Sequence, residues 1–418
     1  MNKSLDINTD IVQKERPSSD GGGNLTPNSE HMTTVLQVLP ALSTGGVERS
    51  TVEVTEAIVE AGGRALVVSN GGNLVHEITR AQGEHIVMPV HSKNPFVMYA
   101  NVGRLVKLIK ENHVDVVHVR SRAPAWSTYF AAKQCGKPLV ITFHGTYSVG
   151  NFLKRKYNAI MTSGNIIIAN SRFIAGHMRR IYGVPINKIR VIHRGVDLLR
   201  FKPKQVSAER VVALANKWRL EDGFPVIMLP GRLTRWKGQT VFIDAIKQLA
   251  RRDIRCLLVG DAQGRDDYRQ ELENLVEHHG LGEIVRIVDH CDDMPAAYML
   301  SDIVVSASTD PEAFGRVVIE AQSLGRPVIS TAHGGARETV IENETGWLVP
   351  PGDVDALAKK LDKALNLTPD QRNILSKKGI ENVHKRFSKD TMCAKTLDVY
   401  NEALTLKKSP NSNHDHPF

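Results

Sequence analysis

The sequence predicts an α/β protein with two doubly wound domains, each a parallel β-sheet between layers of helices. Short apolar runs rich in β-branched residues alternate with longer amphipathic helical patterns, which is typical of βαβ units. This alternation occurs twice, and 418 residues are more than one hydrophobic core usually holds. We expect strands in residues 33–40, 63–70, 114–120, 138–144, 165–170, 225–232, 254–261, 284–290, 302–308 and 326–332.

The division into domains follows from where the strand pattern stops. The first residues are polar and glycine-rich and lack the apolar core of a secretion signal, which predicts disorder. Strand patterning also lapses between the two series, which predicts a linker. The expected parts are a disordered extension (1–32), a first domain (33–200), a linker (201–222), a second domain (223–385), a closing helix (386–405) and a disordered tail (406–418).

Composition and charge limit the class of protein and of partner. No stretch reaches the ~18 uninterrupted apolar residues that a membrane-spanning helix needs. The four cysteines form no C-x-x-C pair and suit reduced thiols in a cytoplasmic protein. A net charge of +9 favours anionic partners, among which are nucleic acids, phosphorylated metabolites and membrane surfaces.

Positive charge is concentrated between Tyr147 and Lys204, with twelve Lys or Arg and one acid. The segment lacks the interleaved aromatic residues that nucleic-acid binding favours, so we expect no nucleic-acid partner. Its cations can attract anionic lipid head groups, and each cation contributes ~1 kcal/mol to binding near a charged membrane surface. We therefore expect peripheral contact with the inner face of the cytoplasmic membrane, and a merely solvated basic face is the alternative. The cations meant are Lys154, Arg155, Lys156, Arg172, Arg179 and Arg180.

Glycine or polar residues follow several of the expected strands. In doubly wound sheets ligands bind beyond the carboxyl ends of the strands, so two domains offer a cleft between two such edges. At Gly45 and Gly46 the backbone can approach an anion at the start of a helix, although an ordinary tight turn is the alternative. His144 can donate to a sugar hydroxyl or orient an acceptor, and a histidine that only caps its strand is the alternative.

Two cations, Arg232 and Lys237, lie around the start of the first helix of the second domain. A guanidinium and an ammonium near a helix N-terminus suit a diphosphate, because both supply charge-assisted hydrogen bonds. A solvated basic turn is the alternative, since Arg235 between them shows that not every cation here need bind a ligand.

The most informative stretch is DPEAFGRVVIE, residues 310–320. A helix is expected to begin near its glycine, with Glu312 in the preceding loop. At about 1.5 Å per residue, Gly315 and Glu320 lie roughly 7–8 Å apart, about the distance from a diphosphate to the ribose of one nucleotide. The first N–H groups of the helix can hold a phosphate, with Arg316 as an added cation. Glu320 can accept from ribose hydroxyls, and Glu312 from those of an attached sugar.

The motifs PEAFGRVVIEA, GRPVIST and GGARETV follow STGGVE, FHG, RGVD and GRLTRWKG along the chain. From about residue 33 to about residue 405, the chain resembles the retaining glycosyltransferases of family four, which have the GT-B fold. The resemblance implies two Rossmann-like domains facing each other across a cleft, with the closing helix returning to the first domain. It also implies transfer from a nucleotide diphosphate sugar with retained anomeric configuration, without an essential metal or a cofactor.

The resemblance also implies roles for single residues. Glu312 would hold hydroxyls of the donor sugar, Glu320 the ribose, and the base would lie near residues 288–295. The leaving phosphate would itself take the acceptor proton, so Glu312 is not expected to be a nucleophile. The expected catalytic residues are His144, Arg232, Lys237 and Glu312. The expected donor-binding residues are Gly45, Gly46, Gly231, Arg232, Lys237, His290, Met294, Glu312, Ala313, Phe314, Gly315, Arg316, Val317 and Glu320.

A narrower resemblance concerns HVRSRAPAW, FHGTY and DPEAFGRVVIEAQSLGRPVI. These stretches are similar to the lipopolysaccharide-core mannosyltransferases of Gram-negative bacteria. They imply a GDP-mannose donor and an anionic glycolipid or oligosaccharide acceptor, which we expect at Arg120, Arg122 and Tyr147. A UDP-linked donor, a non-catalytic subunit that binds sugar nucleotides, and an epimerase remain as alternatives.

The sequence Asp353-Val354-Asp355 has the D-x-D spacing with which many metal-using transferases hold a cation. Pro-Gly-Asp before an apolar helical repeat is, however, a helix-start signal, which favours Asp353 as a helix N-cap. We therefore expect no metal site, and Arg232 with Lys237 accounts for a diphosphate neutralised by side chains alone.

Overall fold

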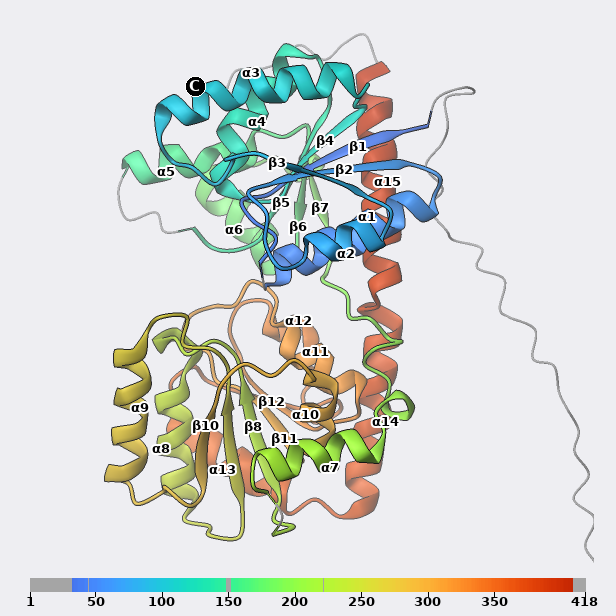
Figure 1. Ribbon diagram of the computed structural model, residues 1–418. Helices are drawn as coiled ribbons and strands as arrows, with labels where there is room; N and C mark the ends of the chain where they lie inside the picture. The colour runs from blue at the N-terminus through green and yellow to red at the C-terminus, as the bar shows by residue number, and fades with distance from the viewer. Residues whose placement is uncertain (1–31, 44, 148–151, 221, 409–418) are drawn as a thin grey trace, which may run out of the picture.

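The computed structural model describes residues 32–43, 45–147, 152–220 and 222–408. In this part of the chain two parallel β-sheets form two domains, one above the other, and the last two helices run along one side of both (Figure 1). The predicted fold class, two doubly wound parallel-sheet domains, is confirmed. The disorder expected in residues 1–31 and 409–418 concerns segments outside the described residues.

The first domain contains a seven-stranded sheet in the order β3-β2-β1-β4-β5-β6-β7. Its strands are β1 (Thr34–Val38), β2 (Arg64–Ser69), β3 (Glu84–Val87), β4 (Val116–Val119), β5 (Leu139–Phe143), β6 (Ile166–Ala169) and β7 (Ile189–Val191). Its helices are α1 (Gly46–Glu60), α2 (Val75–Arg80), α3 (Pro95–Glu111), α4 (Arg122–Gln134), α5 (Phe152–Asn158), η1 (Ala159–Thr162), α6 (Arg172–Tyr182) and η2 (Ile186–Lys188). The central strands β1, β4, β5 and β6 are buried along their whole length, because helices cover both faces of the sheet.

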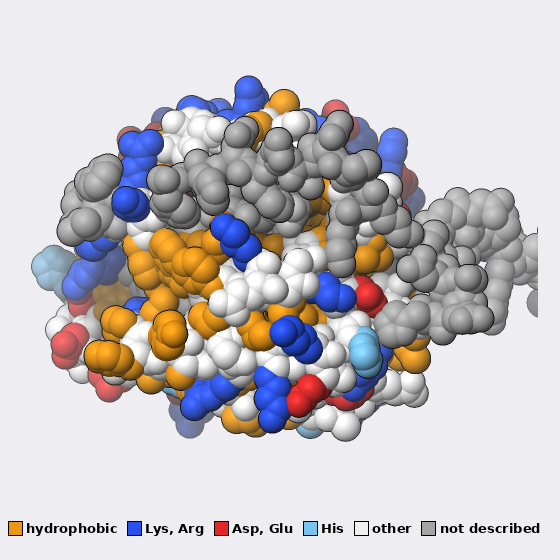
Figure 2. All heavy atoms as spheres, turned by 90° about the horizontal axis from the view of Figure 1, so that it is seen from above, with side chains coloured by type: hydrophobic (Ala, Val, Ile, Leu, Met, Phe, Trp, Pro, Cys, Tyr) orange, Lys and Arg blue, Asp and Glu red, His pale blue; other side chains and the backbone are white. Residues whose placement is uncertain are grey.

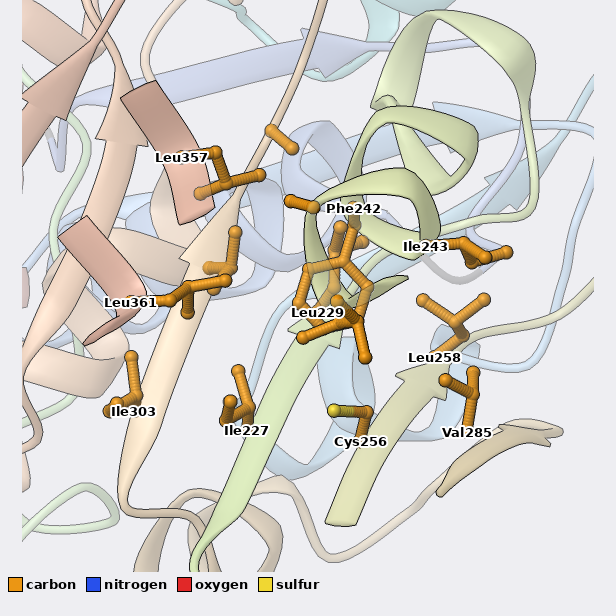
Figure 3. Packing of buried hydrophobic residues seen from close by; sticks show 14 of the residues in the cluster. Ile227, Leu229, Phe242, Ile243, Cys256, Leu258, Val285, Ile303, Leu357 and Leu361 are labelled. Carbon is orange, nitrogen blue, oxygen red and sulfur yellow. The ribbon is translucent and has the colours of Figure 1, made fainter. Parts of the chain in front are cut away.

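The second domain contains a six-stranded sheet in the order β10-β9-β8-β11-β12-β13. Its strands are β8 (Val226–Pro230), β9 (Arg255–Val259), β10 (Val285–Val288), β11 (Ile303–Ser306), β12 (Val328–Thr331) and β13 (Trp347–Val349). The remaining helices are η3 (Pro203–Gln205), α7 (Ala208–Lys217), η4 (Arg235–Lys237), α8 (Gln239–Leu249), α9 (Asp266–His278), α10 (Met294–Leu300), α11 (Arg316–Ser323), α12 (Ala336–Thr339), α13 (Val354–Leu365), α14 (Pro369–Arg386) and α15 (Lys389–Lys408). On one face, side chains of β8 and β9 pack against Phe242 of α8 and Leu357 of α13 (Figure 3).

Three strands were absent from the sequence prediction: β3, β7 and β13. All three are short and lie at the edge of their sheet. The strands β3 and β7 include polar residues and bury few side chains, so their apolar pattern is weak, whereas β13 is apolar but only three residues long. The strand β3, with the sequence EHIV, has no fully buried residue. The ten strands that were predicted are all present, within a few residues of their expected ends.

The segment predicted as a linker, residues 201–222, is instead largely part of the second domain. Helix α7 occupies its centre, and Phe201, Leu214 and Trp218 are buried in a cluster with Val226 and Tyr298. The polar residues of the segment lie on the outer face of an amphipathic helix. The chain therefore crosses between the domains before Phe201, directly after β7.

The chain crosses back between α14 and α15, and the two crossings are hydrogen-bonded to each other. Val196 N donates to Phe387 O at 2.9 Å, and Lys389 N donates to Val196 O at 2.9 Å. Helix α15 then packs on the first sheet, where Tyr400 and Leu397 are buried. This helix ends at Lys408, so residues 406–408, predicted as part of a disordered tail, are helical. No helix among the described residues has the length and apolar character to span a bilayer.

Candidate functional site

Strand ends of the two sheets meet at a cleft between the domains. A hollow of about 490 Å³ lies there, and its lining comes from both domains and from the crossing segments. Six of the predicted donor-binding residues line it: Gly45, Gly46, Met294, Arg316, Val317 and Glu320.

An ion pair joins two of the predicted catalytic residues, Lys237 and Glu312. Lys237 Nζ lies 2.7 Å from Glu312 Oε1, and Ser308 also donates to that oxygen. Both charged side chains are nearly buried, with 13% and 12% of their surface exposed. Burial alone would raise the pKa of Glu312, but the charge and hydrogen bond of Lys237 outweigh it and the pKa is lowered. Glu312 is therefore ionised at neutral pH.

Close backbone packing between three strand-end loops puts this pair in place. Gly238 follows Lys237 at φ 73°, and a Cβ there would lie 2.0 Å from Ala307 O. Gly334, at φ 62°, lies against Glu312, where a Cβ would come within 2.3 Å of the carbonyl oxygen. Gly335 N donates to that same oxygen at 2.8 Å. Only glycine allows approaches this close at positive φ, so Gly238 keeps the Lys237 turn against the end of β11, and Gly334 keeps the Glu312 loop against the segment that follows β12.

Glu320 lies near the start of α11, which begins after Gly315 in a left-handed conformation, φ 85°. The hydroxyl of Tyr298 donates to Glu320 Oε2 at 2.9 Å. Arg316 Nε lies 3.4 Å from the other carboxylate oxygen. Burial, and then the charge of Glu320, raise the pKa of Tyr298, so its hydroxyl keeps its proton and remains a donor.

Arg316 also spans the cleft. One guanidinium nitrogen lies 3.5 Å from Glu53 Oε1 on α1 of the first domain. Its side chain therefore bridges Glu53 and Glu320, each from a different domain, instead of being free for a phosphate as the sequence suggested. Glu53 lies on α1 beyond the STGGVE motif with which that helix begins, so no motif marked this residue in the sequence.

The first-domain wall of the cleft contains a buried hydrogen-bonded network around Ser50. Arg120 donates to Ser50 Oγ and to Gln37 Oε1, both at 2.8 Å, and Arg194 donates to the same serine. Arg120 is only 2% exposed, so the prediction that it contacts an acceptor is wrong. Burial and the nearby charge of Arg120 lower the pKa of Arg194 to about 9, which leaves both arginines charged at neutral pH.

Arg194 also determines the state of His144. Its guanidinium donates to His144 Nδ1 at 2.6 Å, and because arginine can only donate, Nδ1 accepts. Burial first, and then the charges of Arg194 and Arg120, hold the pKa of His144 well below its usual value. The ring is therefore neutral and carries its proton on Nε2. This buried nitrogen has no hydrogen-bond partner among the described residues, so it is an available donor.

Arg194 was part of the RGVD motif, but the sequence analysis gave it no role. The signal that marks it is spatial, because its partners Ser50, on α1, and His144, after β5, lie far from it in the sequence. Tyr298 was missed for a similar reason, since it lies within α10 and no motif marks it.

Some predicted donor-binding residues have other surroundings. Phe314 is 3% exposed and packs against His193 and Phe387 at the two crossings, so its side chain serves packing and not a ligand. Ala313 packs against the core of the first domain. Gly231 lies beside the stem of Lys237, and Arg232 is exposed.

His290 lies away from the cleft hollow. It follows the outermost strand β10, is exposed, and lies 3.1 Å from Asp292 through its Nε2. It lines a separate hollow with Trp218 and Arg286. Two strands, β9 and β8, separate the end of β10 from that of β11, which explains why a strand-end histidine does not reach the Glu312 loop.

The predicted acceptor residues Arg122 and Tyr147 contact each other. The Arg122 guanidinium lies 5.0 Å from the centre of the Tyr147 ring and donates to Asn158 Oδ1 at 2.8 Å. Tyr147 packs on Phe143, and burial raises its pKa to about 12. Neither residue belongs to the lining of the cleft hollow.

The Asp-Val-Asp sequence has the structural role that the helix-start signal predicted. Asp353 is the N-cap of α13, and its carboxylate accepts from Ala356 N at 2.8 Å. Within the described part of the chain, no group of three or more His, Cys, Asp or Glu side chains could hold a metal ion.

Each half of the chain matches a family model of glycosyltransferases. The family model described as Glycosyltransferase Family 4 matches residues 44–200, and the model described as Glycosyl transferases group 1 matches residues 213–382. A D-inositol 3-phosphate glycosyltransferase of Xylanimonas cellulosilytica is 31% identical over 308 residues, which are 70% of this chain and 73% of the relative. The colanic acid glycosyltransferase WcaL of Escherichia coli, described as putative, is 29% identical over 265 residues, 60% of this chain and 61% of the relative.

Solved structures agree with this assignment. The crystal structure of a glycosyltransferase from Rickettsia africae covers 90% of this chain and 100% of its own, with 38% identity and a TM-score of 0.84. Anabaena HepE in complex with UDP-glucose has a TM-score of 0.76 and 23% identity, over 90% of this chain and 99% of its own. At that identity the second likeness shows the fold alone.

Proposed function

Because this chain belongs to the family-four glycosyltransferases and has the GT-B fold, we propose that it is a retaining transferase acting on a nucleotide diphosphate sugar. Its proposed reaction moves a hexose, with mannose as the preferred candidate, to a lipid-linked or lipopolysaccharide-core acceptor. The observation that supports this best is the arrangement of Lys237, Glu312 and Glu320 around the start of α11. Glu320 lines the cleft hollow, whereas the Lys237–Glu312 pair lies outside its lining, before α8 and α11. Together the three residues offer a cation for a diphosphate and two carboxylates for hydroxyls.

In the proposed position of the donor, its ribose and its diphosphate contact different parts of this arrangement. The ribose hydroxyls donate to Glu320, and the diphosphate lies near Gly315 and the start of α11. Lys237 and the exposed Arg232 stabilise the charge that develops on the leaving diphosphate. In the free protein Lys237 is paired with Glu312, so the donor replaces this contact with one to its phosphates and one to its sugar hydroxyls.

The proposed chemistry uses the protein's groups for position and charge. Glu312 is ionised and accepts hydroxyl hydrogen bonds from the sugar, while His144 donates from Nε2. The acceptor attacks from the face that the diphosphate leaves, and the leaving phosphate takes the acceptor proton. Neither residue forms a bond to the sugar, and the cations allow the reaction to proceed without a metal. Turnover that persists in a chelator would support this; loss of turnover restored by a divalent cation would contradict it.

The proposed acceptor is anionic and presented at a membrane surface. Three large apolar side chains, Phe96, Tyr99 and Phe130, are exposed on α3 and α4. The top of the first domain shows apolar side chains interspersed with Lys and Arg (Figure 2). Vesicles with and without anionic lipid test this: binding that needs anionic lipid and weakens in salt is expected, and absence of binding at low salt contradicts it.

The nucleotide is the first property to measure. A ligand that binds only the folded state stabilises it, by about 2.7 kcal/mol at one hundred times its Kd. A thermal-shift series with GDP-mannose, UDP-glucose and ADP-glucose should therefore single out one donor, GDP-mannose by our proposal. The UDP-glucose bound by HepE makes a UDP-sugar the alternative donor. The preferred donor is then incubated with glycolipid acceptor, and the anomeric configuration of the product is determined by NMR.

Two other results would favour a different function. Binding of a donor without turnover on any acceptor would favour a non-catalytic subunit. Conversion of the free donor to its epimer, unaffected by an acceptor, would favour an epimerase.

A further inference from the structure

A carboxylate of the second domain caps a helix of the first. Glu338 lies on α12, and its Oε2 and Oε1 accept from Arg172 N and Phe173 N, each at 2.9 Å. These are the first two N–H groups of α6, which have no partner within the helix. The N-cap Ser171 accepts from Ile174 N, so it leaves these two N–H groups to Glu338.

A histidine on the first-domain side also contacts the carboxylate of Glu338. His193, directly after β7, lies with Nε2 2.8 Å from Glu338 Oε2. Arg386 of α14 donates to the backbone oxygen of Glu338 at 2.7 Å. The carboxylate thus lies where the chain first crosses between domains and beside the end of α14, where it crosses back. We call Glu338, His193 and the first N–H groups of α6 the clasp.

The clasp is continuous with the loop that carries Glu312. Gly335, three residues before Glu338, donates from its backbone to Glu312 O at 2.8 Å. The His193 ring lies 5.7 Å from the ring of Phe314, two residues after Glu312. One short segment, residues 334–338, therefore contacts the Glu312 loop at one end and the first domain at the other.

The carboxylate of Glu338 is ionised at neutral pH. Burial would raise the pKa of Glu338, but the hydrogen bonds from His193 and from the N–H groups of Arg172 and Phe173 outweigh it and the pKa is lowered. Arg172 and Arg386 are the other charged groups beside it. An ionised carboxylate at a helix N-terminus also interacts favourably with the helix dipole.

From these contacts we infer that Glu338 is a positioning residue that sets the closure of the cleft and keeps the Glu312 loop in register with the first domain. This inference rests on the proposed function for its effect on turnover. Hydrogen bonds to charged groups are stronger than those between neutral groups. Loss of the clasp should therefore shift the equilibrium between closed and open cleft by at least about tenfold.

The test compares Glu338→Gln with wild type and with the control Glu344→Gln, which removes a carboxylate from an exposed pair with Lys378. Hydrogen exchange of a peptide spanning the start of α6 should become faster only in Glu338→Gln, and small-angle scattering should show a larger radius of gyration. With a turnover assay, kcat should fall about tenfold while the KM of the donor changes less than threefold, because the cleft residues of the second domain are untouched.

Conservative replacement separates positioning from general damage. Glu338→Asp keeps the charge and should recover part of both the exchange protection and kcat. Exchange and scattering in Glu338→Gln that match wild type would overturn the inference. Absence of transfer activity in the wild type would overturn the proposed function instead, and the exchange and scattering measurements would still decide on the clasp.

Discussion

The two walls of the cleft hold their charges in different ways. On the second-domain wall, Lys237 and Arg316 are paired with Glu312 and Glu320, so each cation has an acidic neighbour. On the first-domain wall, Arg120 and Arg194 donate hydrogen bonds to the neutral groups Gln37, Ser50 and His144. The second wall can exchange partners with a ligand, whereas the first provides a fixed positive field in a buried setting.

This difference also explains which wall could be recognised in the sequence. The residues of the second wall come from short loops in which a glycine and a charged residue are close along the chain. The network of the first wall joins residue 50 of α1 with residues 120, 144 and 194, which follow the strands β4, β5 and β7. The contrast predicts that substitutions on the second wall change ligand chemistry most, and that those on the first act through the state of buried groups.

The largest expected effect is that of Lys237→Ala. Removing one group that stabilises transition-state charge typically lowers kcat by about 100- to 1000-fold. Glu312 also loses its cation partner, so its pKa should rise toward the value that burial favours. The measurement is kcat with the donor identified by thermal shift. The matched control is Arg235→Ala, in the same turn, whose side chain is exposed and paired with Glu271. Normal turnover in Lys237→Ala would remove its assigned role.

The buried groups of the first wall should make the stability of the folded protein depend on pH. His118 and His144 are buried, and burial followed by the nearby arginines holds the pKa of each well below its usual value. As the pH falls below about 6.5 the unfolded chain therefore takes up protons that the folded protein does not, and stability decreases. The loss should reach up to about 1.4 kcal/mol per pH unit for each histidine.

Urea unfolding between pH 7 and pH 5 measures this loss. His144→Gln should reduce the slope of stability against pH, and the control His290→Gln should not, because His290 is exposed. A slope that is the same in wild type and His144→Gln would mean that the pKa of His144 does not differ between the folded and unfolded states, and that the Arg194 contact has been misassigned.

The sequence predicts the fold best where strands are buried on both faces of a sheet. Strands such as β1 and β5 form unbroken apolar runs because helices cover both faces, and these runs are visible in the sequence. The edge strand β3 and the packed segment around α7 gave weaker patterns, because at least half of the residues in β3 and in α7 face solvent. Polar composition alone therefore suggested a linker where an amphipathic helix packs on the second domain.

The candidate site could be predicted only where one residue type has one physical use. Gly315 was expected at a helix start and precedes α11, and Asp353 was expected to be a helix N-cap and is one, so their sequence context was informative. An arginine after a strand has several uses. Arg120 is a buried structural cation and Arg122 lies on a tyrosine ring, yet both follow the same strand. Only their partners, which lie far away in the sequence, distinguish them.

A smaller effect is expected for Glu320→Ala on the second wall. If the ribose hydroxyls donate to this carboxylate, donor affinity should fall about tenfold, which corresponds to about 1.4 kcal/mol. The loss should be much smaller for the 2′-deoxy form of the nucleoside diphosphate, since it lacks one of the hydroxyls. Calorimetric titration with both ligands measures this. An equal loss for both would mean that Glu320 acts through Arg316 and cleft closure.

The smallest effect should follow from Tyr298→Phe, which removes one hydroxyl and leaves both carboxylates. The tyrosine donates to Glu320 Oε2 at 2.9 Å, so it orients the carboxylate and does not itself face the cleft hollow. Loss of one such orienting bond, at about 0.5–1.5 kcal/mol, should weaken donor binding about threefold. In the Glu320→Ala background the same substitution should change affinity little, because the group it orients is absent. Additive losses in the double variant would show that Tyr298 acts on the donor independently of Glu320.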